Sequence, residues 1–338
     1  MAFADRVVSS WYAPRATPLA LALSPLAAVY RIVVAVRRGL YASGALRAER
    51  LPVPVVVVGN LTAGGSGKTP LSIAIAEALA DRGWHPGLVS RGHGREGSEP
   101  RMVSAGDDPV DVGDEPLLLA ASGRPVAVGA RRADAARLLL AREPSCDVVV
   151  ADDGLQHLAL ARDVEIVAID ASRGFGNGRM LPAGPLREPA SRLAEVDAVV
   201  RLVDAAAWRA TGDARESLMA HEPLGWRNLA DPTRTEPAAS FRPEAAWAIA
   251  GTAHPARFFA LVAALGVAAR TRAFPDHHRF SAADLELPGA QAILMTAKDA
   301  VKCMRFADPR CWALDIRARI DPSLVDRIEE ILRGRQAA

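Results

Sequence analysis

One segment limits the possible folds more than any other: a run of β-branched residues that ends in a glycine-rich loop. Residues 52–58 read Pro-Val-Pro-Val-Val-Val-Val, which is typical of a strand buried on both faces of a parallel sheet. The glycine-rich loop occupies residues 62–69, and residues 70–82 carry the apolar stripe of a helix. A buried strand, such a loop and a helix in this order predict a phosphate-binding unit.

The loop consists of residue types that bind phosphate: Thr62, Ala63, Gly64, Gly65, Ser66, Gly67, Lys68 and Thr69. Its backbone N–H groups precede a helix N-terminus, where the helix dipole favours anions. We expect Lys68 to reach the β- and γ-phosphates of ATP and the Thr69 hydroxyl to hold Mg²⁺. Thr62 departs from the usual pattern, which has glycine at this position. A chance Gly-Lys-Thr is rare in a chain with three lysines, so the loop predicts nucleotide binding.

A second apolar strand ends in two carboxylates. Residues 147–152 read Asp-Val-Val-Val-Ala-Asp, and Asp153 follows. A carboxylate delivered beside a phosphate loop commonly holds Mg²⁺, so Asp152 and Asp153 are candidate metal ligands. The spacing leaves open which of them binds directly, and an aspartate here can also cap the next turn.

Strands alternate with helices along most of the chain, which predicts a doubly wound, mostly parallel α/β sheet. Further strands are expected at 87–90, 125–129, 164–170, 198–203, 245–251, 268–274, 292–296 and 312–316, with helices at 130–142, 255–266 and 322–334. Residues 204–243 show little pattern and predict a boundary region. We therefore expect an N-terminal helical region (1–50), a P-loop domain (51–240) and a smaller α/β domain (241–338).

The first 50 residues differ in charge from the rest of the chain. They hold seven arginines and two acidic residues, a balance of +5, whereas the whole chain sums to +2. Val29, Tyr30, Val33, Val36 and Leu40 share one helical face, while Arg31 and Arg38 project from another and Arg37 lies near the apolar face. The pattern predicts an amphipathic helix on an anionic membrane surface; the alternative is a helix packed on the protein's own core.

Composition excludes several other classes. The longest charge-free run in this region, residues 16–30, is shorter than the ~20 residues that span a bilayer and contains two prolines. A near-neutral chain is an unusual nucleic-acid binder. Three cysteines without a Cys-x-x-Cys pair make a disulfide framework or a structural zinc site unexpected and favour a cytoplasmic protein.

Three other polar clusters have both a functional and a structural interpretation. Asp114 stands at a loop-to-helix transition, where it is either an N-cap or part of a site. His277 and His278 follow a short predicted strand, and without a third ligand at metal spacing a general base is the better interpretation. The irregular segment 176–189 is rich in glycine and proline, as functional loops often are.

Taken together, these segments resemble the tetraacyldisaccharide 4′-kinase family of lipid A biosynthesis. The motifs cover about residues 10–305 and occur in this order: VVVVGNLTAGGSGKTP, SRGHGR, GDEPLLLA, ADDGLQH, GRMLPAGPLREP, AGTAHPARFF, FPDHHRF and TAKDAVK. The resemblance implies transfer of the ATP γ-phosphate, with Mg²⁺, to the 4′-hydroxyl of an acylated glucosamine disaccharide 1-phosphate, giving lipid IVA. It also implies a location at the cytoplasmic face of the bacterial inner membrane, without an obligate protein partner.

The same resemblance assigns roles residue by residue. It places Lys68 and Thr69 at the phosphates and Asp152 and Asp153 at the acidic strand end, and adds Arg187 beside the phosphates and Glu188 as a metal ligand. It pairs Asp114 with His277 as a catalytic dyad, with His278 as the alternative base. The chain departs from the family at His93, where tyrosine is frequent, and at Ala297, where glutamate is frequent.

A rival function shares most of these features. A P-loop switch or partitioning ATPase also needs the loop, the acidic strand end and a membrane-touching helix. It does not need a base beside an acceptor hydroxyl, so the Asp114–His277 pair is the feature that separates the two functions.

Overall fold

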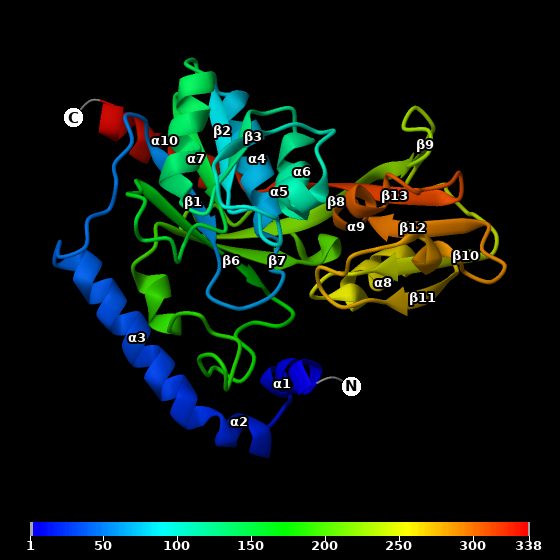
Figure 1. Cartoon of the computed structure of the whole chain (residues 1–338), viewed down its shortest axis with the longest axis horizontal. Coiled ribbons are helices and arrows are strands. Elements are labelled where there is room, and N and C mark those ends of the chain that lie inside the picture. The colour runs from blue at the N-terminus through cyan, green and yellow to red at the C-terminus, as the bar shows by residue number, and fades with distance from the viewer. Residues whose placement is uncertain (1–2, 337–338) are drawn as a thin grey trace.

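The computed structural model describes residues 3–336, and a single 13-stranded sheet runs through it (Figure 1). The strands follow the order β11-β10-β12-β13-β8-β7-β6-β1-β5-β2-β4-β3, and β9 pairs with β8 outside this path. Their bounds are β1 Val55–Gly59, β2 Pro86–Ser90, β3 Arg101–Val103, β4 Val126–Val128, β5 Val148–Asp152, β6 Val164–Asp170, β7 Ala198–Val203, β8 Glu216–Asn228, β9 Thr235–Pro237, β10 Ala246–Ala250, β11 Ala269–Ala273, β12 Ala292–Thr296 and β13 Cys311–Ile320.

The strands from β8 to β4 are parallel and form what we call the large unit, with β3 as an antiparallel edge. Val56 and Val58 face a core made with α4 (Lys68–Ala80), α6 (Asp114–Ala120) and α10 (Pro322–Gln336). Val55 and Val57 face a second core that includes α7 (Arg132–Arg142). Because both faces are covered, the strand needs apolar residues at every position, which explains the continuous valine run.

The strands β10, β11, β12 and β13 are parallel to one another and form the small unit. The helix α9 (Ala297–Cys303) covers one face, with Ile293 and Met295, and α8 (Pro255–Ala264) covers the other, with Ala248 and Leu294. The units are joined where β13 pairs with β8 in antiparallel register from Trp312–Asn228 to Ile320–Met219. In Figure 1 these two long strands bridge the two halves of the molecule.

The predicted boundary region 204–243 contains β8, which at 13 residues is the longest strand among the described residues and which pairs with β7 of the large unit and β13 of the small unit. Its side chains alternate irregularly between buried and exposed, and it contains Pro223 and Gly225 beside charged residues. A strand at a junction is covered only in places, so it lacks the simple hydrophobic period that reveals a buried strand.

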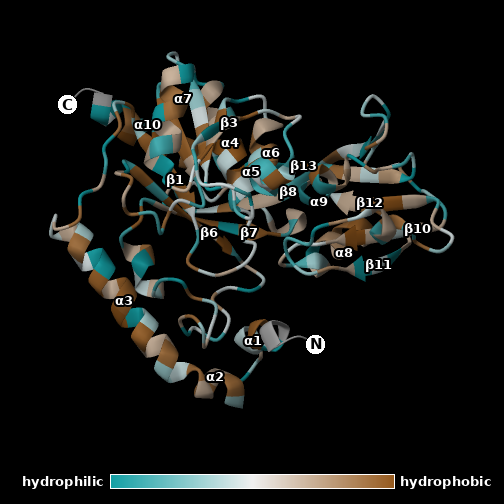
Figure 2. Ribbon diagram, in the orientation of Figure 1, coloured by the Kyte–Doolittle hydropathy of each residue, from teal (hydrophilic) through white to brown (hydrophobic). Residues whose placement is uncertain are grey.

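The N-terminal region forms α1 (Phe3–Trp11), α2 (Pro18–Ala22) and α3 (Ser24–Ala42). In Figure 1, α2 and α3 extend along the outside of the large unit. Tyr30 and Val34 turn inward against its core, so Tyr30 does not share the outer face as expected from the sequence. The outer face carries large apolar side chains that are 41–62% exposed, and Figure 2 shows hydrophobic residues recurring along α3: Leu26, Val29, Ile32, Val33, Val36 and Leu40.

Within residues 3–336 no helix combines the length and apolar character needed to cross a membrane. The predicted α/β class with a mostly parallel sheet is confirmed. The predicted division at residues 50 and 240 stays a prediction, because the sheet continues from one unit into the other. The helix α10 belongs by sequence to the predicted smaller domain, yet Leu324, Ile328 and Leu332 pack in the core of the large unit.

Candidate functional site

The glycine-rich loop connects β1 to α4, and its backbone conformation depends on glycine. Gly64 and Gly67 have φ angles of +102° and +79°, which side-chain-bearing residues rarely adopt. A Cβ at Gly67 would lie 2.8 Å from Met219 Cε and 3.1 Å from Leu202 Cδ2, so a side chain there would require these neighbours to shift. Asn60 is fully buried before the loop, and its amide donates to the Gly64 carbonyl at 3.3 Å. The loop is therefore held in one shape from both sides.

The start of the loop is anchored by the irregular segment 176–189. Thr62 forms an isolated antiparallel bridge with Leu186, and the Ala63 N–H donates to the Pro185 carbonyl at 2.7 Å. The Arg187 N–H in turn donates to the Leu61 carbonyl at 2.6 Å. This pairing brings the Arg187 side chain to the loop. It also gives Thr62, the first residue of the loop, a short strand-like contact with Leu186.

Asp152 lies at the end of β5, fully buried beneath α4. Its two carboxylate oxygens accept hydrogen bonds from Thr69 Oγ1 and Ser72 Oγ, both at 2.9 Å. Burial, reinforced by the nearby charges of Glu115 and Asp153, raises the pKa of Asp152 to about 6. A carboxylate in such a place is poised to accept a cation, because positive charge beside it restores its ionised form.

Asp153 follows in a left-handed conformation, with φ of +48°, and faces the loop lysine. Lys68 Nζ lies 3.5 Å from Asp153 Oδ1, and Arg187 Nη1 lies 3.3 Å from the same oxygen. Burial alone would raise the pKa of Asp153, but Lys68, Arg187 and Arg132 together hold that pKa below its usual value. The two adjacent aspartates therefore differ: Asp152 contacts the hydroxyls, and Asp153 contacts the cations.

Glu188 is not brought together with the other predicted metal ligands. Its side chain is buried, accepts a hydrogen bond from Gln156 Nε2 at 2.8 Å, and lies 3.4 Å from Arg38 and 3.6 Å from Arg192. In the part of the chain that the structure describes, no three His, Cys, Asp or Glu side chains gather as a metal site would require. The oxygen atoms that do converge beside the loop belong to Thr69 and Asp152.

Asp114 and His277 meet although they are 163 residues apart. Asp114 begins α6 in the large unit, and His277 lies in the loop after β11 of the small unit, where its φ is +58°. His277 Nδ1 lies 3.1 Å from Asp114 Oδ2. This hydrogen bond raises the pKa of His277 against the opposing effect of burial, and His277 with Lys298 holds the pKa of Asp114 at about 2 despite burial.

The neighbouring histidine points elsewhere. His278 Nε2 lies 3.2 Å from Asp284 Oδ2, and its ring stacks on Phe274 at a centroid distance of 4.6 Å. Asp284 also caps the short 3₁₀ turn that begins after Ser281. Of the two adjacent histidines, His277 therefore contacts Asp114, whereas His278 packs within the small unit.

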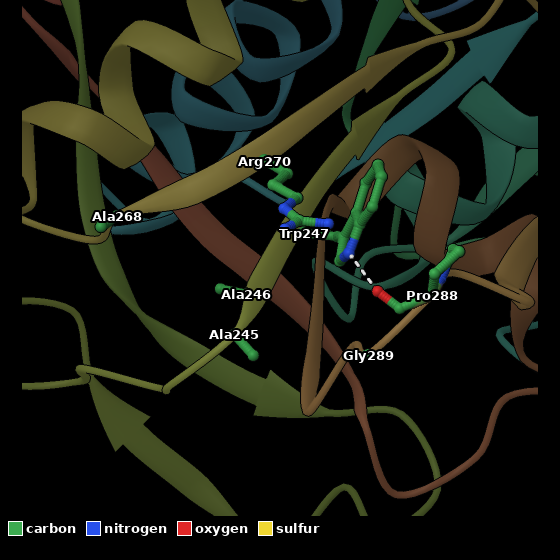
Figure 3. Close-up of a pocket in the computed structure, with 7 residues that line it drawn as sticks. All are labelled: Ala245, Ala246, Trp247, Ala268, Arg270, Pro288 and Gly289. Carbon is green, nitrogen blue, oxygen red and sulfur yellow. Dashed lines mark hydrogen bonds between the residues drawn. The ribbon is translucent and has the colours of Figure 1, made fainter.

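A cleft of about 1180 Å³ connects the glycine-rich loop with His277. Its lining includes the loop residues from Gly64 to Thr69, Asp153 and Arg187 from the large unit, and His277 and Lys298 from the small unit. A smaller pocket of about 220 Å³ lies at the far end of the small unit, where Trp247 donates to the Pro288 carbonyl at 3.3 Å beside Arg270 (Figure 3). That pocket contains none of the predicted site residues.

Sequence reasoning missed several residues that shape the cleft. Arg132 at the start of α7 donates to the Asp153 carbonyl at 2.9 Å, and Arg257 of α8 contacts the Asp170 carboxylate across the cleft at 2.5 Å. Lys298 contacts Asp114, Glu115 and Asp276. Only the lysines offered a signal, since the chain has three of them and two stand four residues apart in TAKDAVK.

Comparison with known proteins gives a consistent result. The family model described as tetraacyldisaccharide-1-P 4′-kinase matches residues 19–333. The tetraacyldisaccharide 4′-kinase of Dechloromonas aromatica is 48% identical over 327 residues, covering 96% of each chain. That of Alkalilimnicola ehrlichii is 49% identical over 320 residues, covering 92% of each. The crystal structure of the "apo" form of LpxK from Aquifex aeolicus in complex with ATP aligns with a TM-score of 0.77 at 29% identity, covering 93% of this chain and 99% of that one.

The family match covers both units, the loop and both members of the Asp114–His277 pair. The identities extend over nearly the full length of the relatives, so they do not come from a shared nucleotide-binding segment alone. The chain belongs to the tetraacyldisaccharide-1-P 4′-kinase family.

Proposed function

We propose that this chain transfers the γ-phosphate of ATP to the 4′-hydroxyl of a tetraacyldisaccharide 1-phosphate, the reaction named for its family. The observation that carries the proposal is the Asp114–His277 contact between the two units, because His277 lines the same cleft as Lys68 and Asp153. One side of the cleft carries groups for a polyphosphate, and the other carries a base for an acceptor hydroxyl.

The residues divide the chemistry between them. A sugar hydroxyl has a high pKa, so its proton must be accepted as the phosphoryl group arrives. Neutral His277 can accept that proton at Nε2 while Asp114 receives the Nδ1–H and stabilises the imidazolium that forms. Lys68, Arg187 and the loop N–H groups supply positive charge where the γ-phosphate carries negative charge. The loop and its surroundings are thus assigned a P-loop NTPase arrangement.

Mg²⁺ fits the oxygen atoms that converge beside the loop. The Thr69 hydroxyl and the Asp152 carboxylate are hard oxygen donors and already touch each other at 2.9 Å. These two, with Asp153 beside them, are the residues we assign to the ion, which would neutralise phosphate charge when bound. Glu188 is a weaker candidate, because Arg38 and Arg192 occupy its carboxylate.

The exposed face of α3 fits a membrane surface. Val29, Ile32, Val33 and Val36 present an apolar stripe to solvent, and Arg31 and Arg37 lie exposed on the same helix. Apolar burial together with arginine–headgroup attraction is how interfacial helices bind anionic lipid. We therefore assign the chain to the cytoplasmic face of the inner membrane, with α3 lying in the interface and the acylated substrate entering from the bilayer.

The decisive experiment measures turnover of ATP with and without the acylated disaccharide 1-phosphate. A 4′-kinase transfers radiolabelled phosphate from the γ-position of ATP to the lipid, and ATP consumption matches lipid phosphorylation. A switch or partitioning ATPase releases free phosphate whether or not the lipid is present. If all the consumed ATP appears as free phosphate while the lipid gains no radiolabel, the proposal is wrong.

A further inference from the structure

Lys298 joins the two units at the point where the dyad forms. It lies on α9 of the small unit, and its Nζ is 3.1 Å from Glu115 Oε1 and 3.8 Å from Asp114 Oδ2, both on α6 of the large unit. The same Nζ lies 3.8 Å from Asp276 Oδ1, next to His277. One ammonium group therefore contacts three carboxylates on both sides of the boundary that the dyad crosses.

The Asp114 carboxylate is fully engaged, and each contact fixes its orientation. Oδ1 accepts the Glu115 N–H at 3.0 Å, while Oδ2 faces His277 Nδ1 at 3.1 Å, Lys298 Nζ at 3.8 Å and Lys302 Nζ at 4.0 Å. Lys302 is itself held by the buried Asp299 at 2.8 Å. Two cations therefore face the oxygen that accepts the hydrogen bond from His277 Nδ1–H, and they keep that oxygen ionised and in place.

The helix that carries Lys298 is firmly anchored. Asp299 accepts hydrogen bonds from the Gly251 N–H at 3.0 Å and from Thr296 Oγ1 at 2.8 Å, and it is completely buried. Thr296 in turn caps the start of α9 by accepting the Asp299 N–H at 3.1 Å. The backbone position of Lys298 is thus set by contacts of α9 within the small unit.

The use of lysine at this place is itself informative. Of the 41 basic residues in the chain, three are lysine and the other 38 are arginine. All three lysines lie at the site: Lys68 in the phosphate loop and Lys298 and Lys302 against Asp114. A compact ammonium group can sit among several carboxylates, whereas the planar guanidinium of arginine favours bidentate contact with one partner.

From this geometry we infer that Lys298 is a positioning residue for the proposed phosphoryl transfer: it fixes Asp114 against His277 by tying α6 to the loop that carries the histidine. The inference rests on the proposed function, since it gives Lys298 a role in that reaction. Lys298 acts through Asp114 and Asp276 and does not itself accept a proton.

The charges around His277 give this role a measurable signature. Asp114 and Asp276 favour the protonated ring, Lys298 opposes it, Lys302 faces the shared Asp114 oxygen, and the His93 ring packs edge-on at 4.8 Å. If Lys298 only contributed charge, its loss would raise the pKa of His277. If it positions Asp114, its loss weakens the Asp114–His277 hydrogen bond, which is the main cause of the raised pKa, so the pKa of His277 falls. We therefore expect the acid limb of the kcat profile to move to lower pH.

The test compares Lys298→Met, which removes the charge but keeps the length, with Lys298→Arg, which keeps the charge. Lys298→Met is expected to lower kcat by about 10- to 100-fold, the range for losing a supporting contact, with the KM for ATP within about twofold. Lys298→Arg is expected to recover part of kcat and to keep the wild-type acid limb. Lys298→Gln replaces Lys298→Met if the methionine variant does not fold.

Arg305→Met is the matched control. Arg305 follows α9 and pairs with Asp108 of the large unit, so it crosses the same boundary without touching the dyad. It is exposed, and its loss is expected to leave kcat and the acid limb unchanged. An equal loss of kcat in Arg305→Met and Lys298→Met would mean that Lys298 only holds the units together, and the inference would be wrong.

Two further measurements separate this inference from the proposed function. Histidine titration by NMR, with His277 assigned by its absence in His277→Gln, reports the pKa without any turnover; an unchanged or raised pKa of His277 in Lys298→Met overturns the inference. Lys298→Met in an Asp114→Asn background is expected to cost less than in wild type, because both changes act through one carboxylate. If Lys298→Met lowers kcat by the same factor in both backgrounds, the inference is wrong. A wild-type chain that phosphorylates no lipid would refute the proposed function instead.

Discussion

The two sides of the cleft are built in different ways. The side that we propose to bind phosphate, called the phosphate side, consists of Lys68, Thr69, Asp152 and Asp153, from two adjacent parallel strands and the loop and helix that follow them. The side that we propose to bind the acceptor, called the acceptor side, consists of Asp114 from the large unit and His277 and Lys298 from the small unit. The residues of the phosphate side therefore all belong to the large unit, whereas those of the acceptor side come from both units.

This difference has physical consequences. The loop is fixed by glycine conformations and backbone hydrogen bonds, which substitutions in side chains of the small unit leave in place. The dyad depends on one histidine contact and a group of ion pairs across a boundary, so small shifts between the units disturb it. We expect variants of the phosphate side to lose transfer outright, and variants of the acceptor side to lose rate while they still bind ATP.

The largest effect is predicted for the phosphate loop. Lys68→Ala and Thr69→Ala should each lower kcat by about 10³-fold or more. The first removes a positive charge beside the transferred phosphate, and the second removes a hydroxyl that we assign as a ligand of Mg²⁺. Radiolabel transfer at saturating ATP and Mg²⁺ measures this, with circular dichroism to show that the fold survives. Exposed Arg50→Ala, which removes only an ion pair with Asp163, serves as control. Near-normal transfer by Lys68→Ala would remove the loop from the chemistry.

The second prediction concerns the dyad. His277→Ala and Asp114→Ala should each lower kcat by about 10²–10³-fold, within the range for losing a general base, with little change in ATP affinity. The double variant should be little worse than either single one, because the two groups act as a unit. His278→Ala is the control, since His278 contacts Asp284 and Phe274 instead. Multiplicative losses in the double variant would argue against the dyad.

The dyad also sets the pH dependence. The hydrogen bond to Asp114 raises the pKa of His277, and only neutral His277 can accept a proton. Activity of the wild-type chain should therefore fall as the pH drops through that raised pKa. Asp114→Asn removes the negative partner and lowers the pKa of His277, so the acid limb should move to lower pH while the plateau rate falls. If the acid limb of Asp114→Asn stays at the wild-type pH, a group other than His277 causes that limb.

The smallest effect on kcat is predicted for variants of the outer face of α3, because its apolar side chains belong to neither the phosphate side nor the acceptor side. Val33→Glu with Val36→Glu should weaken sedimentation with anionic vesicles and raise the KM for lipid by about tenfold, while the KM for ATP stays unchanged. Both side chains are more than half exposed, so stability should change little. Ala35→Glu, exposed on the side of Arg31, is the control. Equal vesicle binding by all three proteins would favour a purely structural helix.

Three strands have the boundaries that the sequence predicts: β6 at 164–170, β7 at 198–203 and β12 at 292–296. Each is largely buried, so its residues form an almost continuous apolar run with clear ends. The junction strand β8 and the short helix α9 were missed. Their side chains contact distant segments of the chain, and such contacts produce no regular hydrophobic period in the local sequence.

The sequence alone predicted a phosphate-binding unit, because strand, loop and helix are contiguous and the loop has glycine, lysine and threonine at the spacing typical of phosphate loops. It also carried the family motifs that named Asp114 and His277. Only the tertiary structure decided which of the adjacent histidines meets Asp114, that Asp152 contacts the hydroxyls while Asp153 contacts the cations, and that Glu188 lies between two arginines. The first of these outcomes depends on the pairing of β8 with β13, which joins the two units and lets Asp114 and His277, 163 positions apart, lie within 3.1 Å. The other two depend on packing within the large unit and against α3, and contacts between segments so far apart leave no pattern in the local sequence.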